Sequence, residues 1–140
     1  MATYYTRKNV HVDRIATAWL IKRYIDREAV FAFVENLEQV PGAIPFDMPG
    51  AKLGHQGDDC SFETVLKTNH LSEPGLDELA QIIHGADILS DLDVTLESAG
   101  IDLAFRAVRI SSANDKAALD FGFQLLDGLL LAIRERKANR

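Results

Sequence analysis

The sequence predicts a helix-rich α+β fold, with a small β-sheet, four to five helices and a Pro/Gly-rich loop region. Short runs of β-favouring residues occur near the N-terminus, whereas the second half shows apolar residues at helical spacing. Three of the four prolines and four of the nine glycines fall between positions 41 and 57, where they break both periods. A chain of 140 residues has the length of one domain, so we expect a single domain over residues 1–140.

The first half of the chain alternates predicted strands and a helix. Thr3–Thr6 favours a strand, and His11–Tyr24 predicts a helix because its apolar residues recur every three to four positions. Ala29–Val34 is a short β-rich run and predicts a second strand. Within the Pro/Gly-rich loop, we expect only short strands, at Ile44–Asp47 and Ala51–Gly54.

The second half predicts four helices. Ser61–Thr68 is the shortest, with Cys60 or Ser61 at its cap, and the next begins near Ser72 with Pro74 in its first turn. Two longer helices are expected over Leu96–Ile110 and from Asn114 or Asp115 to about Lys137. The basic residues near the end of the last one suit its negative C-terminal end.

The composition indicates which partners and which cellular location to expect. The net charge of −6 argues against nucleic-acid binding by this chain alone. The most apolar run, Leu125–Ile133, is too short to span a membrane, and we expect no signal peptide because Met1–Asn9 is polar. A single cysteine excludes an intrachain disulfide. We therefore expect a cytoplasmic protein with no membrane partner.

The helix expected to begin near Ser72 carries one candidate set of metal ligands. His84, Asp87 and Asp91 stand at i, i+3 and i+7, which places them on one stripe beside the apolar face. Partly buried histidine and aspartate need a partner, and a metal ion or an arginine would supply it. The alternative is a helix-terminal histidine with Asp87 capping the next turn.

The Pro/Gly-rich loop and the following helix offer a second set. Glycines near His55 let the backbone present its imidazole, and Glu63 follows in the first helical turn. Together they could give one nitrogen and one oxygen to a divalent metal. The alternatives are a structural capping box for Glu63 and a solvated turn for Asp58.

Three further residues are candidates from their position at helix starts. His11 lies at the start of the first predicted helix, where it could be a metal ligand or an acid–base group. The alternative is a histidine with no role beyond the helix start. Arg14, one turn later, has the forked guanidinium that holds an anion bidentately. Cys60 lies at a helix start, where the thiol pKa is lowered, or it is a small buried residue.

Several segments resemble the ChrB-type domain of chromate-resistance proteins. The matching segments are Val10–Ala16, Ala18–Ile21, Ile44–Gly50, His55–Asp58, Cys60–Thr64 and Ile83–Asp87. The resemblance covers about Thr6 to Asp127 and implies a domain best known as the C-terminal part of larger regulators of chromate-inducible resistance. The recurrent polar positions of that family fall here on His11, Asp13, Arg14, His55, Asp58, Cys60, Glu63, His84 and Asp87.

These observations predict a small metal-binding domain, which would be a metal-dependent enzyme if an open coordination position activates water or dioxygen. The expected ligands to Zn, Fe, Mn or Ni are His55, Glu63 and His84, with His11 or Asp87 as the fourth. Asp13, Asp58 and Asp87 would contact the ligands from outside, and Arg14 would hold an oxyanion or a substrate carboxylate. Cys60 would take part in redox chemistry or simply pack in the core.

Two alternatives belong to other classes. The first is a metal-free oxyanion sensor, with Arg14 and a protonated His11 or His55 binding the anion. The second is a homodimer formed through the long apolar helix Asp115–Arg136.

Overall fold

A computed structural model describes residues 2–139 and has the predicted α+β architecture, with five α-helices and three strands in that part of the chain. The elements in chain order are β1 (Thr3–Arg7), α1 (Val12–Leu20), η1 (Ile21–Ile25), β2 (Val30–Val34), β3 (Ile44–Pro45), α2 (Ser61–Thr68), α3 (Leu76–Asp87), η2 (Leu89–Asp91), α4 (Ser98–Ser111) and α5 (Asp115–Ala138).

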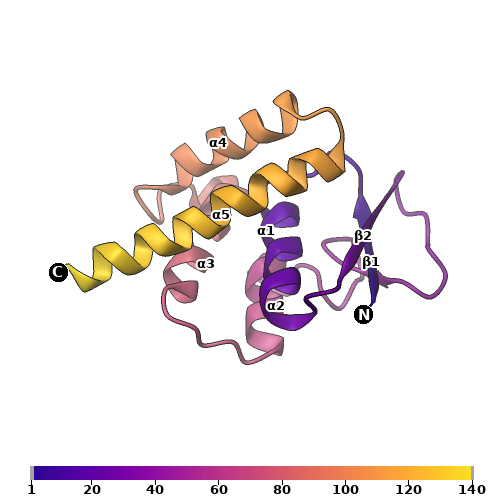
Figure 1. Cartoon of the computed structure of the whole chain (residues 1–140), viewed down its shortest axis with the longest axis horizontal. Coiled ribbons are helices and arrows are strands. Elements are labelled where there is room, and N and C mark those ends of the chain that lie inside the picture. Colours follow the sequence, from indigo (N-terminus) through magenta and orange to yellow (C-terminus); the bar gives the residue numbers. More distant parts are fainter. Residues whose placement is uncertain (1, 140) are drawn as a thin grey trace.

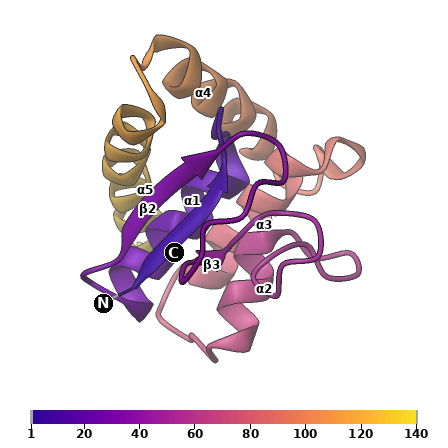
Figure 2. The ribbon, with the colours of Figure 1, turned by 90° about the vertical axis from the view of Figure 1, so that its right-hand side faces the viewer.

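The sheet is parallel throughout, with β1 between β2 and β3. Thr3 pairs with Val30 and Tyr5 with Pro45, so the three strands run in register from the same edge. Parallel neighbours need a crossover, and α1 supplies it between β1 and β2. Consequently the carboxyl ends of β1 and β3 lie at the same edge of the sheet as the start of α1. Figure 2 shows the sheet nearly face on.

The two faces of the sheet have different covers. Tyr4 belongs to the large core formed with the helices, whereas Tyr5 and Val34 belong to a smaller cluster with Met48 and Ala51. The Pro/Gly-rich loop therefore packs over the face that the helices leave free. The strand expected at Ala51–Gly54 does not form, since only Leu53 makes an isolated bridge, to Phe46.

Helix α1 is the centre of the core. Its apolar residues are almost fully buried, and Trp19, 1% exposed, donates a hydrogen bond of 2.7 Å to Asp127 of α5. The predicted helix continues past Leu20 as the π-helical turn η1, closed by a bond from the Asp26 N–H to the Ile21 carbonyl. Figure 1 shows α4 and α5 as an antiparallel pair lying across α1, with the sheet at one end.

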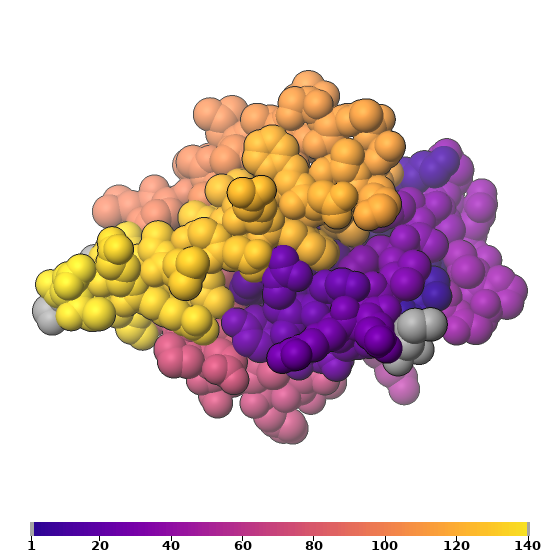
Figure 3. All heavy atoms as spheres, in the orientation of Figure 1, coloured from indigo at the N-terminus to yellow at the C-terminus, as the bar shows by residue number. Residues whose placement is uncertain are grey.

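Helix α5 begins where the sequence predicts. The Asn114 side chain accepts a hydrogen bond of 2.9 Å from the Ala117 N–H, which caps the helix. The far end of α5 protrudes from the body of the molecule (Figure 3). Across residues 2–139, no helix is both long and apolar enough to cross a membrane.

Helix α3 is shorter than the sequence predicts. It begins at Leu76 after Gly75, whose φ of +85° places it in the left-handed region, so Ser72 does not cap it. It also ends at Asp87, and Asp91 lies in the 3₁₀ turn η2. The expected stripe of His84, Asp87 and Asp91 is therefore divided between two elements.

Candidate functional site

Three aspartates converge on one histidine at the carboxyl edge of the sheet. From His55 Nε2, the nearest carboxylate oxygens of Asp87, Asp13 and Asp47 lie at 3.2, 3.3 and 3.6 Å. Asp13 comes from the first turn of α1, Asp47 follows β3, Asp87 ends α3 and His55 lies in the Pro/Gly-rich loop. We call these four residues the aspartate cluster. Four separate segments of the fold thus build one small site.

Asp13 is fixed by the start of α2. Its side chain is 2% exposed, and its two carboxylate oxygens accept hydrogen bonds of 2.9 Å from the backbone N–H groups of Ser61 and Phe62. These N–H groups have no partner within their own helix and form its positive end, which favours a carboxylate. Asp13 therefore joins α1 to α2 and remains ionised in the interior.

Asp47 is held by two side chains and an uncommon backbone conformation. Its φ of +47° lies in the left-handed region, which aspartate tolerates better than most residues. Arg14 Nε donates to Asp47 Oδ2 at 2.9 Å, and the Ser61 hydroxyl donates to Asp47 Oδ1 at 2.6 Å. The carboxylate is thereby aimed toward His55.

The electrostatics show a site with surplus negative charge. Burial, followed by repulsion from Asp13, raises the pKa of Asp47 to about 6, and burial with repulsion from Asp13 and Asp47 raises the pKa of Asp87 to about 7. Contact with Asp13 raises the pKa of His55 to about 9. Although burial opposes it, contact with His55 and two backbone N–H groups lowers the pKa of Asp13.

The spacing of the cluster matches a coordination shell. Ligand atoms around a cation at about 2.0–2.2 Å lie roughly 3.0–3.5 Å from one another. The 3.2–3.6 Å separations around His55 Nε2 are close to that range and longer than the 2.7–2.9 Å typical of charge-assisted hydrogen bonds. Single ligand atoms of Asp13, His55 and Asp87 also all lie within 4.8 Å of one another. The donor set suits a divalent cation.

A cavity of about 380 Å³ opens beside this cluster. Asp47, His55 and Asp87 line it together with Arg7 and Arg14, and Met48, Pro49 and Gly50 form the rest of its wall. The His55 side chain is 49% exposed, so the site is reachable from solvent. A small molecule in the cavity would touch the cluster directly.

A second group of potential ligands lies around His84, and its members are hydrogen-bonded to one another. His84 Nδ1 lies 2.5 Å from Glu63 Oε1, and His84 Nε2 lies 2.7 Å from Asp91 Oδ2. Burial opposes the charged imidazole, but both carboxylates raise the pKa of His84. Glu63 also accepts the Cys60 N–H at 3.0 Å, which confirms the capping-box alternative for this residue. Within this group, Cys60, Glu63 and His84 have metal-ligand spacing.

The structure divides the ligand set expected from sequence. His55 lies in the aspartate cluster, whereas Glu63 and His84 lie in the second group. His11 belongs to neither, because its Nε2 is 2.8 Å from Asp102 Oδ1 on α4, and burial lowers its pKa. Asp58 is exposed in the turn after His55 and joins neither group.

The remaining predicted residues have mixed placements. Asp13 and Asp87 contact His55 directly instead of supporting it from outside. Arg14 lines the cavity, and its Nε donates to Asp47. Cys60 is fully buried, and this burial raises its pKa strongly, whereas its helix-start position alone predicts a lowered pKa.

Two residues of the site were missed from the sequence. These are Asp47, which the sequence places only at the end of an expected short strand, and Arg7, which no sequence pattern indicated. The available signal was positional, because both come at the carboxyl ends of strands, where ligands of parallel sheets bind.

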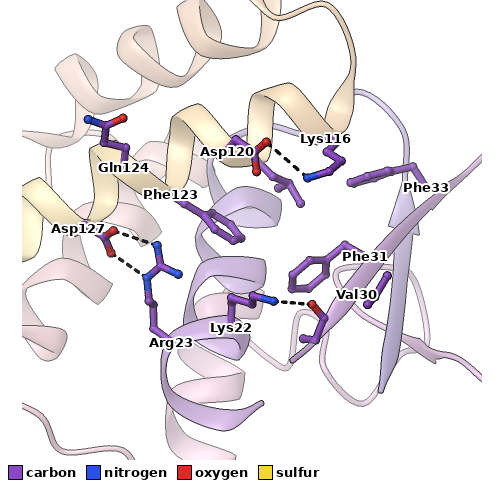
Figure 4. Close-up of a pocket in the computed structure, with 12 residues that line it drawn as sticks. Lys22, Arg23, Val30, Phe31, Phe33, Lys116, Asp120, Phe123, Gln124 and Asp127 are labelled. Carbon is purple, nitrogen blue, oxygen red and sulfur yellow. Dashed lines mark hydrogen bonds and ion pairs between the residues drawn. The ribbon is translucent and has the colours of Figure 1, made fainter. Parts of the chain in front are cut away.

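A larger cavity, of about 550 Å³, lies elsewhere, between α5, η1 and β2. Phe31, Phe33 and Phe123 point into it from two elements, and its charged residues pair locally (Figure 4). Arg23 binds Asp127 at 2.9 Å, and Lys22 donates to the Ala29 carbonyl at 2.9 Å. None of the site residues predicted from sequence lines this cavity.

Comparison with known proteins identifies the family. Protein ChrB of Cupriavidus metallidurans is 40% identical over 126 residues, which are 89% of this chain and 38% of that protein. The chain thus spans about two fifths of the length of this relative. No solved structure matches. The family model described as "ChrB, C-terminal domain" matches residues 4–133. The chain therefore belongs to the ChrB C-terminal domain family, as its sequence resemblance predicted.

Proposed function

We propose that this chromate-resistance family domain binds one divalent transition-metal ion in the aspartate cluster. Asp13, His55 and Asp87 would be the ligands, and Asp47 lies close enough to add a fourth oxygen. The observation that carries the proposal is the spacing of 3.2–3.6 Å around His55 Nε2, which is longer than the roughly 2.7–2.9 Å of charge-assisted hydrogen bonds and close to the separation of ligand atoms around a cation.

The charge of the cluster supports the same proposal. Three carboxylates face one imidazole and one guanidinium, and burial together with repulsion between the carboxylates raises the pKa of Asp47 to about 6 and that of Asp87 to about 7. A divalent cation removes this repulsion, and its binding energy then stabilises the fold. The backbone N–H groups that hold Asp13 would keep one ligand preorganised.

The second group around His84 is a weaker candidate for the metal. Both ring nitrogens of His84 are engaged by carboxylates at 2.5 and 2.7 Å, so the group is satisfied as an ion-pair network. Its thiol, on Cys60, is fully buried and has a raised pKa, and metal binding would require that thiol to ionise.

One histidine and two or three carboxylates are a hard, oxygen-rich donor set. It suits Fe(II), Mn(II) or Zn(II), and it leaves coordination positions for water or a ligand in the 380 Å³ cavity. When bound, such an ion supplies Lewis-acid chemistry toward a polar group in that cavity. The expected metal-free oxyanion sensor has less support, because Asp47 already occupies the Arg14 guanidinium.

The test compares two aspartates from adjacent parts of the chain. Elemental analysis and metal titration of the wild type should give one ion per chain. Asp87→Asn should abolish or strongly weaken binding, whereas Asp91→Asn, which alters the His84 network, should retain it. Equal binding by wild type and Asp87→Asn, or no binding by any of the three, would reject the proposal.

A further inference from the structure

We propose that Arg7 anchors a small anion in the cavity beside the metal, so that the ligand of this site is an oxyanion or a carboxylate bridging Arg7 and the ion. The inference rests on the proposed metal site and names the chemical class that the site accepts. Arg7 was not among the residues singled out by sequence.

The first observation is an unsatisfied donor. The Nε of Arg7 is buried and has no hydrogen-bond partner among the described residues. Over residues 2–139, Arg7 also forms no ion pair. A buried N–H without an acceptor is costly. An acceptor supplied from outside the chain would complete it.

The second observation is position. Arg7 is the last residue of the central strand β1, and it lines the same cavity as Asp47, His55 and Asp87. In parallel sheets, ligands bind at the carboxyl ends of the strands, where neighbouring connections diverge. Here β1 has a neighbour on each side, so Arg7 stands at that crevice.

The third observation separates Arg7 from Arg14. Arg14 Nε donates to Asp47 at 2.9 Å, so this guanidinium already has a carboxylate partner. Arg7 has none, and its planar guanidinium can donate hydrogen bonds to two oxygens of one ligand. The two arginines therefore have different roles: Arg14 orients Asp47, and Arg7 is free to bind the ligand.

Charge makes the anion site dependent on the metal. Without metal, the three aspartates of the cluster compete with an incoming anion for the donor groups of His55, Arg14 and Arg7. A divalent ion held by these carboxylates adds positive charge to the wall of the cavity. An anion should therefore bind the metal-loaded protein and bind the metal-free protein far more weakly.

The experiment uses the whole chain loaded with Co²⁺, because its visible absorption reports both metal occupancy and a new ligand near the ion. Sulfate and oxalate are titrated separately, in chloride buffer, to distinguish an inorganic oxyanion from a carboxylate. The variants are Arg7→Ala and Arg7→Lys. Arg27→Ala is the matched control, since Arg27 is exposed before β2, at the opposite edge of the sheet, and its loss changes the net charge equally.

We expect the wild type to bind at least one of the two anions, and Arg27→Ala to bind that anion with the same affinity as the wild type. Arg7→Ala should keep the Co²⁺ spectrum but bind that anion roughly 10- to 100-fold more weakly, and Arg7→Lys should lie between. Unchanged anion affinity in Arg7→Ala, or no response of the wild type to either anion, would overturn the inference and leave the metal site intact. Failure of the wild type to bind Co²⁺ would overturn the proposed function itself.

Discussion

Gly122 of α5 is a close-packing position that can be tested quantitatively. A Cβ at this position would lie 2.4 Å from Ile15 Cγ2 and 3.4 Å from a ring carbon of Phe105. Ordinary carbon contacts are about 3.5–4.0 Å, so Gly122→Ala requires α1 and α5 to separate by about 1 Å. Because α1 carries Asp13 and Arg14, this contact also positions the candidate site.

Two opposing effects set the change in unfolding free energy that Gly122→Ala should cause. Overpacking costs about 1–3 kcal/mol, and the upper end applies because Ile15 is fully buried and cannot move aside. The better helix propensity of alanine returns about 1 kcal/mol. We therefore expect Gly122→Ala to lower the free energy of unfolding by about 2 kcal/mol.

Gly128 in the same helix is the matched control. Nothing lies within 4 Å of a Cβ placed there, so Gly128→Ala should raise stability by about 0.5–1 kcal/mol. Urea unfolding, followed by the fluorescence of the single buried Trp19, measures both variants. The two should differ by about 3 kcal/mol, or roughly 10 °C in Tm. Variants of equal stability would refute the close contact of α5 with α1.

Three further predictions concern the site itself. Asp13→Asn should lower the unfolding free energy by about 2–3 kcal/mol, because an amide can accept from only one of the two backbone N–H groups at 2.9 Å; unfolding no different from that of Asp87→Asn, a variant without this role, would contradict it. Metal affinity should fall as pH drops through about 7, where Asp87 takes up a proton, and binding near pH 7.5 should release the proton of His55, whose pKa is about 9. Calorimetry in buffers of different ionisation enthalpy measures this release, and a pH-independent affinity between pH 6 and 8 counts against it. Iodoacetamide should label buried Cys60 only after unfolding, so rapid labelling of the native protein would show that the thiol is accessible.

Much of the fold was predictable because local signals agree with tertiary packing. The apolar period of α1 and the capping of α5 by Asn114 gave their positions, and the β-rich run gave β2. The start of α3 was predicted wrongly because Gly75 adopts a left-handed conformation that displaces the expected cap at Ser72. The parallel order of the strands rests on long-range pairing, which no local period specifies.

The site was predictable in its residue types but not in its grouping. Helical spacing indicated Asp87, nearby glycines indicated His55 and the family resemblance indicated Asp13, yet none of these signals predicts that His84 pairs with Glu63 and Asp91. Asp47 escaped notice because its role depends on a left-handed backbone conformation and on contacts with Arg14. These contacts join segments that are distant along the chain, and only the fold determines them.

X-ray absorption spectroscopy of the Co²⁺-loaded protein tests the central claim most directly. The aspartate cluster offers one imidazole nitrogen and carboxylate oxygens, whereas the second group includes the sulfur of Cys60. The account predicts a shell of nitrogen and oxygen at about 2.0–2.2 Å, with scattering from one imidazole that His55→Ala removes. A sulfur ligand at about 2.3 Å, lost in Cys60→Ser and retained in His55→Ala, would place the metal at the second group and contradict the account.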